Sequence, residues 1–264
     1  MWVGRIDASG FMRILSYNIL DGGLGRADPL AEIIESQRPD VVVLIEADNG
    51  DVVERIAKRL DMESIIGQGR KHTAAVLSRW AIVESINHGA VHDKPDCLLE
   101  ATIRAPGGGE WIMGAVHLHA RALEADEAER ERELAVLLGI FESHRRAGRP
   151  HLLAGDFNSN SPIQRIDPEK VKPTTREAWQ ANGKQIPRRV VQKLLDAGYV
   201  DTLEAAHPEA APVAASFTTQ HPGQRVDYIF VHGIDTSRVR GAWIEQDRLA
   251  KYASDHFPIG VEIV

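Results

Sequence analysis

The stretch Gly155-Asp156-Phe157-Asn158 has the residue types and spacing of a catalytic motif. It follows the apolar run 151–154, which is typical of a buried strand. A carboxylate and a carboxamide two residues apart therefore emerge at the C-terminal end of a strand, where open α/β sheets place their chemistry. Carboxylates in such a position are suited to bind a hard divalent cation. The same residues could instead form an ordinary turn, because Gly, Asn and Asp are common turn residues.

The same arrangement, a polar or ionisable residue at the end of a strand-like apolar run, recurs elsewhere in the chain. The other stretches are Leu15-Ser16-Tyr17-Asn18, Leu44-Ile45-Glu46, His117-Leu118, Arg225-Val226-Asp227-Tyr228 and Ser254-Asp255-His256. In content and order, the whole set matches the motifs of the endonuclease/exonuclease/phosphatase superfamily. From about residue 13 to its end, the chain resembles these metal-dependent phosphoesterases, which include pancreatic-type deoxyribonucleases, AP endonucleases, sphingomyelinases and inositol-polyphosphate phosphatases.

The resemblance implies an α/β fold of four layers, an α/β sandwich in which two mixed β-sheets pack face to face with helices outside. The site should lie at one rim of the sandwich. Motif residues from both ends of the chain must meet there, so we expect a single domain over residues 1–264.

The resemblance also implies a metal site for Mg²⁺ or Mn²⁺. It assigns Glu46 as the principal ligand, Asp255 as a ligand that binds directly or through water, and Asn18 as a residue that supports the ligand or contacts phosphate. The superfamily usually has Gln before this Glu, and Ile45 replaces it here. A divalent cation would stabilise the charge on the phosphoryl oxygens and on the leaving alkoxide.

The remaining motif residues are expected to move protons and hold the phosphate. An Asp that accepts a hydrogen bond from one imidazole nitrogen fixes the tautomer and raises basicity, and we assign Asp227 and His256 to such a pair. By resemblance, Asp156 and Asn158 position the attacking water and a phosphate oxygen, and His117 donates to the phosphoryl oxygens. Asp156 and His256 remain alternative proton acceptors, since the two can titrate as one unit.

Three further residues are candidates for substrate binding. His119 and Arg121 lie just beyond His117, and strand alternation could put His119 on the same face as His117. Tyr228 is the third candidate, although a residue in this position more often holds the motif residues in place. A basic loop, Arg70 to His72, could also reach substrate.

Periodicity predicts the elements that position these residues. Strands are expected at 13–19, 41–45, 63–66, 74–78, 81–87, 98–104, 111–116, 151–154, 226–231, 239–245 and 258–263, and helices at 29–37, 51–60, 123–146 and 190–197. The acidic run 124–133 is interpreted as a solvated helix face remote from phosphate. Residues 159–186 are polar and rich in proline with no clear period, and we expect this long connection to border the cleft.

Composition limits the substrate class and the cellular compartment that we expect. The chain has 264 residues, a net charge of −7 and a single cysteine, Cys97, which sits in an apolar pattern typical of the core. One cysteine cannot form an intramolecular disulfide, and no signal peptide or membrane span is visible. We therefore expect a cytoplasmic, monomeric protein with no membrane partner. The acidic balance disfavours nucleic acid without excluding it, because a local basic cleft could survive.

These patterns predict a divalent-metal-dependent hydrolase of small or modified phosphodiesters or phosphomonoesters, in which water attacks phosphorus in line. A DNA or RNA nuclease of the same fold is the alternative. A further alternative, from a different functional class, is a non-catalytic binding module on this scaffold. Such a module should have lost motif residues, and every expected position here retains a competent side chain.

Overall fold

Two six-stranded sheets form the centre of the molecule. The computed structural model describes residues 11–91, 95 and 97–264. In spatial order, the first sheet holds β11 (Val239–Ile244), β12 (Ile259–Ile263), β1 (Met12–Asn18), β2 (Val41–Ile45), β4 (Thr73–Ser78) and β3 (Glu63–Gln68). The second holds β5 (Ile82–Asn87), β6 (Cys97–Arg104), β7 (Glu110–His117), β8 (His151–Asp156), β10 (Asp227–His232) and β9 (Val200–Asp201). Each sheet has one parallel pair, β1 with β2 and β7 with β8, and antiparallel neighbours around it.

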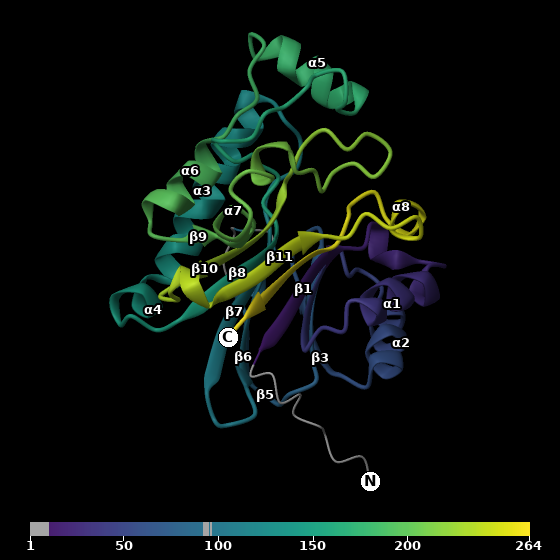
Figure 1. The fold of residues 1–264 in the computed structure, drawn as a ribbon, viewed down its shortest axis with the longest axis vertical. Helices are drawn as coiled ribbons and strands as arrows, with labels where there is room; N and C mark the ends of the chain where they lie inside the picture. Colours follow the sequence, from purple (N-terminus) through teal and green to yellow (C-terminus); the bar gives the residue numbers. More distant parts are fainter. Residues whose placement is uncertain (1–10, 92–94, 96) are drawn as a thin grey trace.

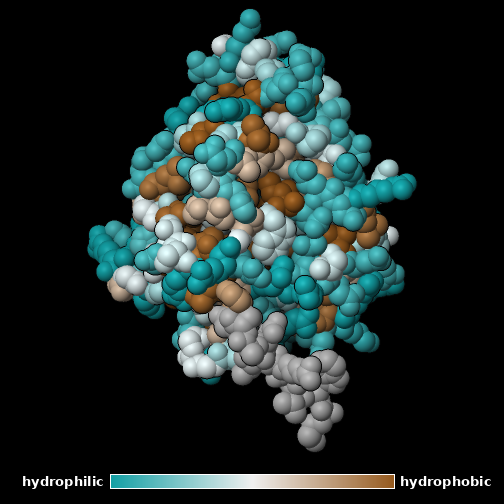
Figure 2. Space-filling view, viewed as in Figure 1, coloured by the Kyte–Doolittle hydropathy of each residue, from teal (hydrophilic) through white to brown (hydrophobic). Residues whose placement is uncertain are grey.

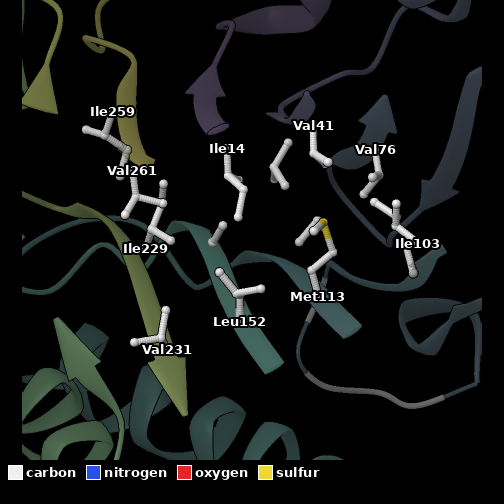
Figure 3. Packing of buried hydrophobic residues seen from close by; sticks show 14 of the residues in the cluster. Ile14, Val41, Val76, Ile103, Met113, Leu152, Ile229, Val231, Ile259 and Val261 are labelled. Atoms are coloured by element: carbon white, nitrogen blue, oxygen red, sulfur yellow. The ribbon is translucent and has the colours of Figure 1, made fainter. Parts of the chain in front are cut away.

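The two sheets pack face to face through alternate side chains of their strands. Ile14 and Val41 of the first sheet lie in one apolar cluster with Met113 and Leu152 of the second (Figure 3). Cys97 is 1% exposed within this cluster, as its apolar surroundings predicted. Side chains alternate across a strand, so the outward-facing apolar side chains of the central strands need helices to cover them.

Helices cover both outer faces of this pair of sheets (Figure 1). α1 (Ala27–Ser36) and α2 (Gly50–Leu60) pack on the first sheet, and α3 (Glu124–Ile140) and α6 (Arg189–Asp196) pack on the second. The remaining helices are α4 (Glu142–Arg146), α5 (Pro173–Ala181), α7 (Thr202–Ala206) and α8 (Ala250–Ala253). The predicted four-layer α/β sandwich is therefore confirmed.

Two predicted elements differ from the structure. The long helix expected at 123–146 is divided at Phe141, whose ψ of 2° leaves the α conformation between α3 and α4. The segment 159–186, expected to lack structure of its own, contains α5. Pro173 is pre-organised for the first turn of this helix, and strong helix formers such as Glu177 and Ala178 follow.

The interpretation of the acidic run as a solvated face was wrong for three of its residues. Glu127, Arg130 and Glu133 are 0%, 1% and 4% exposed. The side chain of Arg130 donates from Nε to Oε2 of Glu127 at 2.9 Å, so the two charges are neutralised inside the protein. A charge run in sequence does not reveal which of its members find buried partners.

The surface seen in Figure 2 is mostly hydrophilic, with hydrophobic residues gathered in its middle and below α5. Among the helices of the described residues, none has the length and apolar character needed to cross a membrane.

Candidate active site

Strand register brings the motif residues of each sheet to one rim. Asn18 pairs with Ile45 in the parallel β1–β2 ladder, so Glu46 follows directly beside Asn18. In the second sheet, Asp156 pairs with His117 on one side and with Asp227 on the other. Because the sheets pack face to face, both sets of strand ends meet at the same rim.

The backbone has a positive φ angle at the motif positions Gly155 and Glu46. Gly155 has φ of 143°, and a Cβ there would lie 2.0 Å from the carbonyl oxygen of Val116, so close packing of β8 against β7 requires glycine. Glu46 has φ of 54°, an uncommon conformation for a residue other than glycine. Such conformations cluster at functional sites, where surrounding contacts hold them in place.

An oxygen-rich centre forms around Asn18. Its Nδ2 donates to Oε1 of Glu46 at 3.0 Å and to Oδ2 of Asp156 at 3.2 Å. The backbone N–H of Asp21 donates to Oε2 of Glu46 at 3.1 Å. Burial favours the neutral acid of Glu46, but the charge of His117 and the Asn18 hydrogen bond outweigh it and hold the pKa of Glu46 below its ordinary value.

The donor set around Glu46 and Asp255 fits a hard divalent cation. Within the described part of the chain, Oδ1 of Asp255 is buried without a hydrogen-bond partner, and Nε2 of His256 is 4.0 Å away. Burial, together with the charge of Glu46, raises the pKa of Asp255. A cation held by Glu46 and Asp255, with Asn18 supporting Glu46, would relieve this repulsion and would stabilise negative charge on phosphoryl oxygens.

His256 and Asp227 form the predicted pair. Nδ1 of His256 lies 2.9 Å from Oδ2 of Asp227, and both side chains are buried. Burial opposes a charge on the imidazole, but Asp227 and Asp156 outweigh burial and raise the pKa of His256 to about 10. The predicted proximity of Asp227 and His256 is therefore confirmed.

Asp156 lies at the centre of these groups. Its Oδ2 is 3.6 Å from Nε2 of His256 and 3.7 Å from Nε2 of His117. Burial and the charge of Asp227 raise the pKa of Asp156 to about 7. Two groups so close exchange protons as one unit, and a pKa near neutrality suits a general base.

The loop after β8 holds Asn158 beside Asp156. The backbone N–H of Asn158 donates to Oδ1 of Asp156 at 2.9 Å, and its Nδ2 donates to the carbonyl of Leu118 at 3.0 Å. Asn158 has φ of 51°, which asparagine tolerates better than most residues. The carboxylate and the carboxamide therefore line the same cavity as His117.

A cavity of about 670 Å³ opens beside these groups. Glu46, His117, Asp156, Asn158, Asp255 and His256 line one part of it. The segment 172–187, including α5, lines another part, so residues 159–186 do border the site as predicted.

The three candidates for substrate binding have different surroundings. Arg121 lines the cavity. The side chain of His119 lies 3.0 Å from Asp126 and is not among the residues that line the cavity. The prediction for Tyr228 was wrong, because this side chain is 1% exposed and its hydroxyl donates to the carbonyl of Arg225 at 2.8 Å.

Sequence reasoning missed the residues that hold the cavity wall. Arg130 lines the cavity and donates from Nη1 to the carbonyls of His119 and Arg121, at 2.8 and 2.6 Å. Glu127 accepts from the Ser159 hydroxyl at 3.0 Å and from the Val190 N–H at 2.9 Å. Their spacing of three residues on a helix was the available signal, since such residues are neighbours on its surface.

Comparison with known proteins identifies the family. The model of the Endonuclease/Exonuclease/phosphatase family matches residues 15–256. The chain belongs to this family. It is accordingly a metal-dependent phosphoesterase. No curated protein matches it in sequence.

Solved structures share the fold at low sequence identity. A 3′ phosphatase, NExo, from Neisseria, bound to a product DNA hairpin, is 22% identical with a TM-score of 0.73, over 96% of this chain and 99% of that one. An AP endonuclease from Archaeoglobus fulgidus is 18% identical with a TM-score of 0.68, over 95% and 98%. An endonuclease/exonuclease/phosphatase from Beutenbergia cavernae is 20% identical with a TM-score of 0.69, over 96% and 71%.

Proposed function

We propose that this protein hydrolyses small phosphodiesters or phosphomonoesters with the help of Mg²⁺ or Mn²⁺, by in-line attack of water on phosphorus. Glu46 and Asp255 would hold the cation, with Asn18 supporting Glu46. Asn158 would help to orient the attacking water, and Asp156 with the His256–Asp227 pair would accept its proton as one unit. His117 would hold a phosphoryl oxygen. The cavity beside these residues is the observation that favours a small substrate.

The cavity is lined by both charged and apolar residues. Its volume of about 670 Å³ falls within the range of pockets for small molecules, roughly 300 to 1,000 Å³. The apolar residues that line it are Ala120, Ala122, Leu123, Ala178, Ala181, Ile186, Pro187 and Phe217. We therefore propose a substrate whose phosphate lies among the site residues and whose alcohol portion is compact and carries apolar surface.

The cations that line the cavity, which include Lys172 and Arg121, suit additional anionic groups on a small substrate. Lys172 lines the cavity, with Nζ 4.3 Å from the centre of the Phe217 ring, and that ring is 4.5 Å from the His256 ring. Arg176, on α5, instead pairs with Glu169 at 3.1 Å. Binding along a nucleic-acid backbone depends on many simultaneous phosphate contacts, which this part of the chain does not offer as a row.

Processing of DNA ends is the second candidate. The similar structures include a 3′ phosphatase bound to a product DNA hairpin and an AP endonuclease. A terminal phosphoester could enter a walled cavity more readily than the middle of a duplex. This candidate requires the same metal and proton-transfer residues as the first.

A panel of substrates distinguishes hydrolysis of small phosphoesters from processing of DNA ends. Purified protein with Mg²⁺ or Mn²⁺ is assayed on aryl phosphomonoesters and phosphodiesters, mononucleotides, a 3′-phosphorylated oligonucleotide and supercoiled plasmid, each at low and physiological salt. We expect kcat/KM to be highest for a small ester and to change little with salt. Efficient plasmid cleavage at physiological salt would contradict the proposal, and preferential turnover of the 3′-phosphorylated oligonucleotide would favour the second candidate.

A further inference from the structure

A second group of potential metal ligands lies next to the oxygen-rich centre. Glu46, His72 and His117 each offer one ligand atom, and these atoms all lie within 4.8 Å of one another. His72 directly precedes β4, and His117 ends β7. The two imidazole rings lie 5.0 Å apart between centres, at 49° to each other. This group therefore combines two nitrogen donors with the carboxylate that the oxygen-rich centre also uses.

Backbone pairing between β2 and β4 places His72 beside Glu46. Ile45, the last residue of β2, pairs with Ala74 in this antiparallel ladder. One step further, the N–H of Ala47 donates to the carbonyl of Thr73 at 2.8 Å. The residues just beyond the paired ends, Glu46 and His72, are thus brought together by the sheet itself.

Asp48 fixes the orientation of His72. Its Oδ2 lies 2.9 Å from Nδ1 of His72, and its Oδ1 accepts from the N–H of Thr73 at 2.7 Å. In the neutral imidazole, Nδ1–H donates to Asp48 and Nε2 carries the lone pair. A carboxylate that accepts from the other ring nitrogen is the usual support of a metal-binding histidine, since it sets the tautomer and raises basicity.

The carboxylate of Glu46 is also fixed in orientation by hydrogen bonds. Asn18 and the backbone of Asp21 each donate to one of its carboxylate oxygens. Glu46 and His72 are half-buried and His117 is buried, with Glu46 and His117 lining the large cavity. A cation could therefore reach the group through the cavity without rearrangement of the core.

We propose that Glu46, His72 and His117 form a second divalent-cation site that shares Glu46 with the oxygen-rich centre and selects Mn²⁺, Co²⁺ or Zn²⁺ over Mg²⁺. Mg²⁺ prefers oxygen ligands and keeps its waters, whereas imidazole nitrogen suits first-row transition metals. This site goes beyond the proposed function, because the ion would bind whichever phosphoester is the substrate. With the site filled, His117 would hold the phosphoryl oxygen through the cation instead of donating to it.

Direct detection of nitrogen on a bound metal tests the site without reference to activity. The full chain is loaded with two equivalents of Mn²⁺ and studied by pulsed electron paramagnetic resonance, which detects ¹⁴N nuclei coupled to the ion. Isothermal titration with Mn²⁺ and Mg²⁺ gives stoichiometry. We expect two Mn²⁺ per chain with ¹⁴N coupling, and a lower stoichiometry for Mg²⁺.

Variants identify the source of the nitrogen. His72→Ala should remove one Mn²⁺ and reduce the ¹⁴N signal, and Asp48→Asn, which leaves the imidazole in place, should weaken Mn²⁺ binding at this site roughly 10- to 100-fold. His207→Ala, an exposed histidine outside the cavity, is the matched control. A single Mn²⁺ per chain, or a ¹⁴N signal that is unchanged in both His72→Ala and His117→Ala, would overturn the proposal. If His72→Ala does not fold, Asp48→Asn decides alone, and unchanged Mn²⁺ affinity in that variant would overturn it.

Discussion

Nδ2 of Asn18 lies 3.2 Å from Oδ2 of Asp156, although the two residues are 138 positions apart and belong to different sheets. This contact joins the end of β1 in the first sheet to the end of β8 in the second. The same amide nitrogen donates to Glu46, so one side chain links the proposed cation ligand to the proposed proton acceptor. Packing of the two sheets therefore creates the site, and neither sheet carries it alone.

The His256–Asp227 pair should be needed for proton transfer. We expect His256→Ala and Asp227→Asn each to lower kcat by roughly 10²-fold or more, the usual scale of general acid–base contributions. The reason is that Asp227→Asn can no longer favour the tautomer and charge that Asp227 gives His256 at 2.9 Å. Steady-state kinetics on the best small ester measures this. Asp235→Asn, at an exposed turn, is the control, and equal kcat in all three variants would show that the pair plays no part.

The buried Glu127–Arg130 pair should hold the cavity wall. Glu127→Gln leaves Arg130 without its charged partner, and breaking a buried pair costs about 3 to 5 kcal/mol. We expect a loss of unfolding free energy on this scale together with a higher KM, because Arg130 holds the carbonyls of His119 and Arg121. Chemical denaturation and kinetics give both quantities.

The control for this variant lies on the same helix. Glu129 and Arg132 form an exposed pair with the same spacing, so Glu129→Gln should change stability by no more than about 1 kcal/mol. Equal effects of Glu127→Gln and Glu129→Gln would contradict a structural role for the buried pair.

The apolar lining of the cavity should set affinity for the alcohol portion of the substrate. Ala181 is exposed on α5 and lines the cavity, so Ala181→Phe fills space there without disturbing the core. We expect KM for small esters to rise about tenfold, equivalent to about 1.4 kcal/mol, with a smaller change in kcat. Gln180→Phe, one residue earlier and not among the cavity residues, should leave KM unchanged. An unaltered KM in Ala181→Phe would place the substrate elsewhere.

His151 should make stability depend on pH. Burial lowers the pKa of His151 to about 4, with further lowering from His232, His144 and Arg145. The unfolded chain, with an ordinary pKa near 6.5, binds a proton at higher pH than the folded chain does. Stability is therefore full above about pH 6.5 and falls as pH drops towards 4, by roughly 3 kcal/mol from this residue.

Unfolding free energy between pH 7 and 4 tests this. His151→Gln should flatten the decline relative to the native chain, whatever its stability at pH 7. His207→Gln, at an exposed position, should leave the decline intact. A decline of the same size in His151→Gln would mean that other groups cause it.

Local patterns were sufficient for the strands and for most of the site. Apolar runs such as 41–45 identify strands buried on both faces, and a polar residue directly after each run identifies the rim. The family resemblance then grouped Glu46, Asp156 and His256, which the sheet register does bring to one rim.

Contacts between residues that lie far apart in the chain could not be predicted from local sequence patterns. Burial of Glu127 and Arg130 depends on Ser159 and Val190, which lie more than one element away in the chain. Tyr228 follows a motif residue on β10, and alternation turns it to the opposite side of the strand, into the core under α3 and α6. Proximity in sequence to a motif was therefore a poor guide to contact with substrate.

Metal dependence of hydrolysis tests the central claim most directly. The native chain and Glu46→Gln are exhaustively chelated, and hydrolysis of the best small phosphoester is measured before and after addition of Mg²⁺ or Mn²⁺. We expect chelation to abolish activity, and the metal to restore it in the native chain and not in Glu46→Gln, because this substitution removes the carboxylate that Asn18 and Asp21 hold in place. Full activity of the chelated protein, or normal restoration in Glu46→Gln, would contradict a metal-dependent phosphoesterase site built on Glu46.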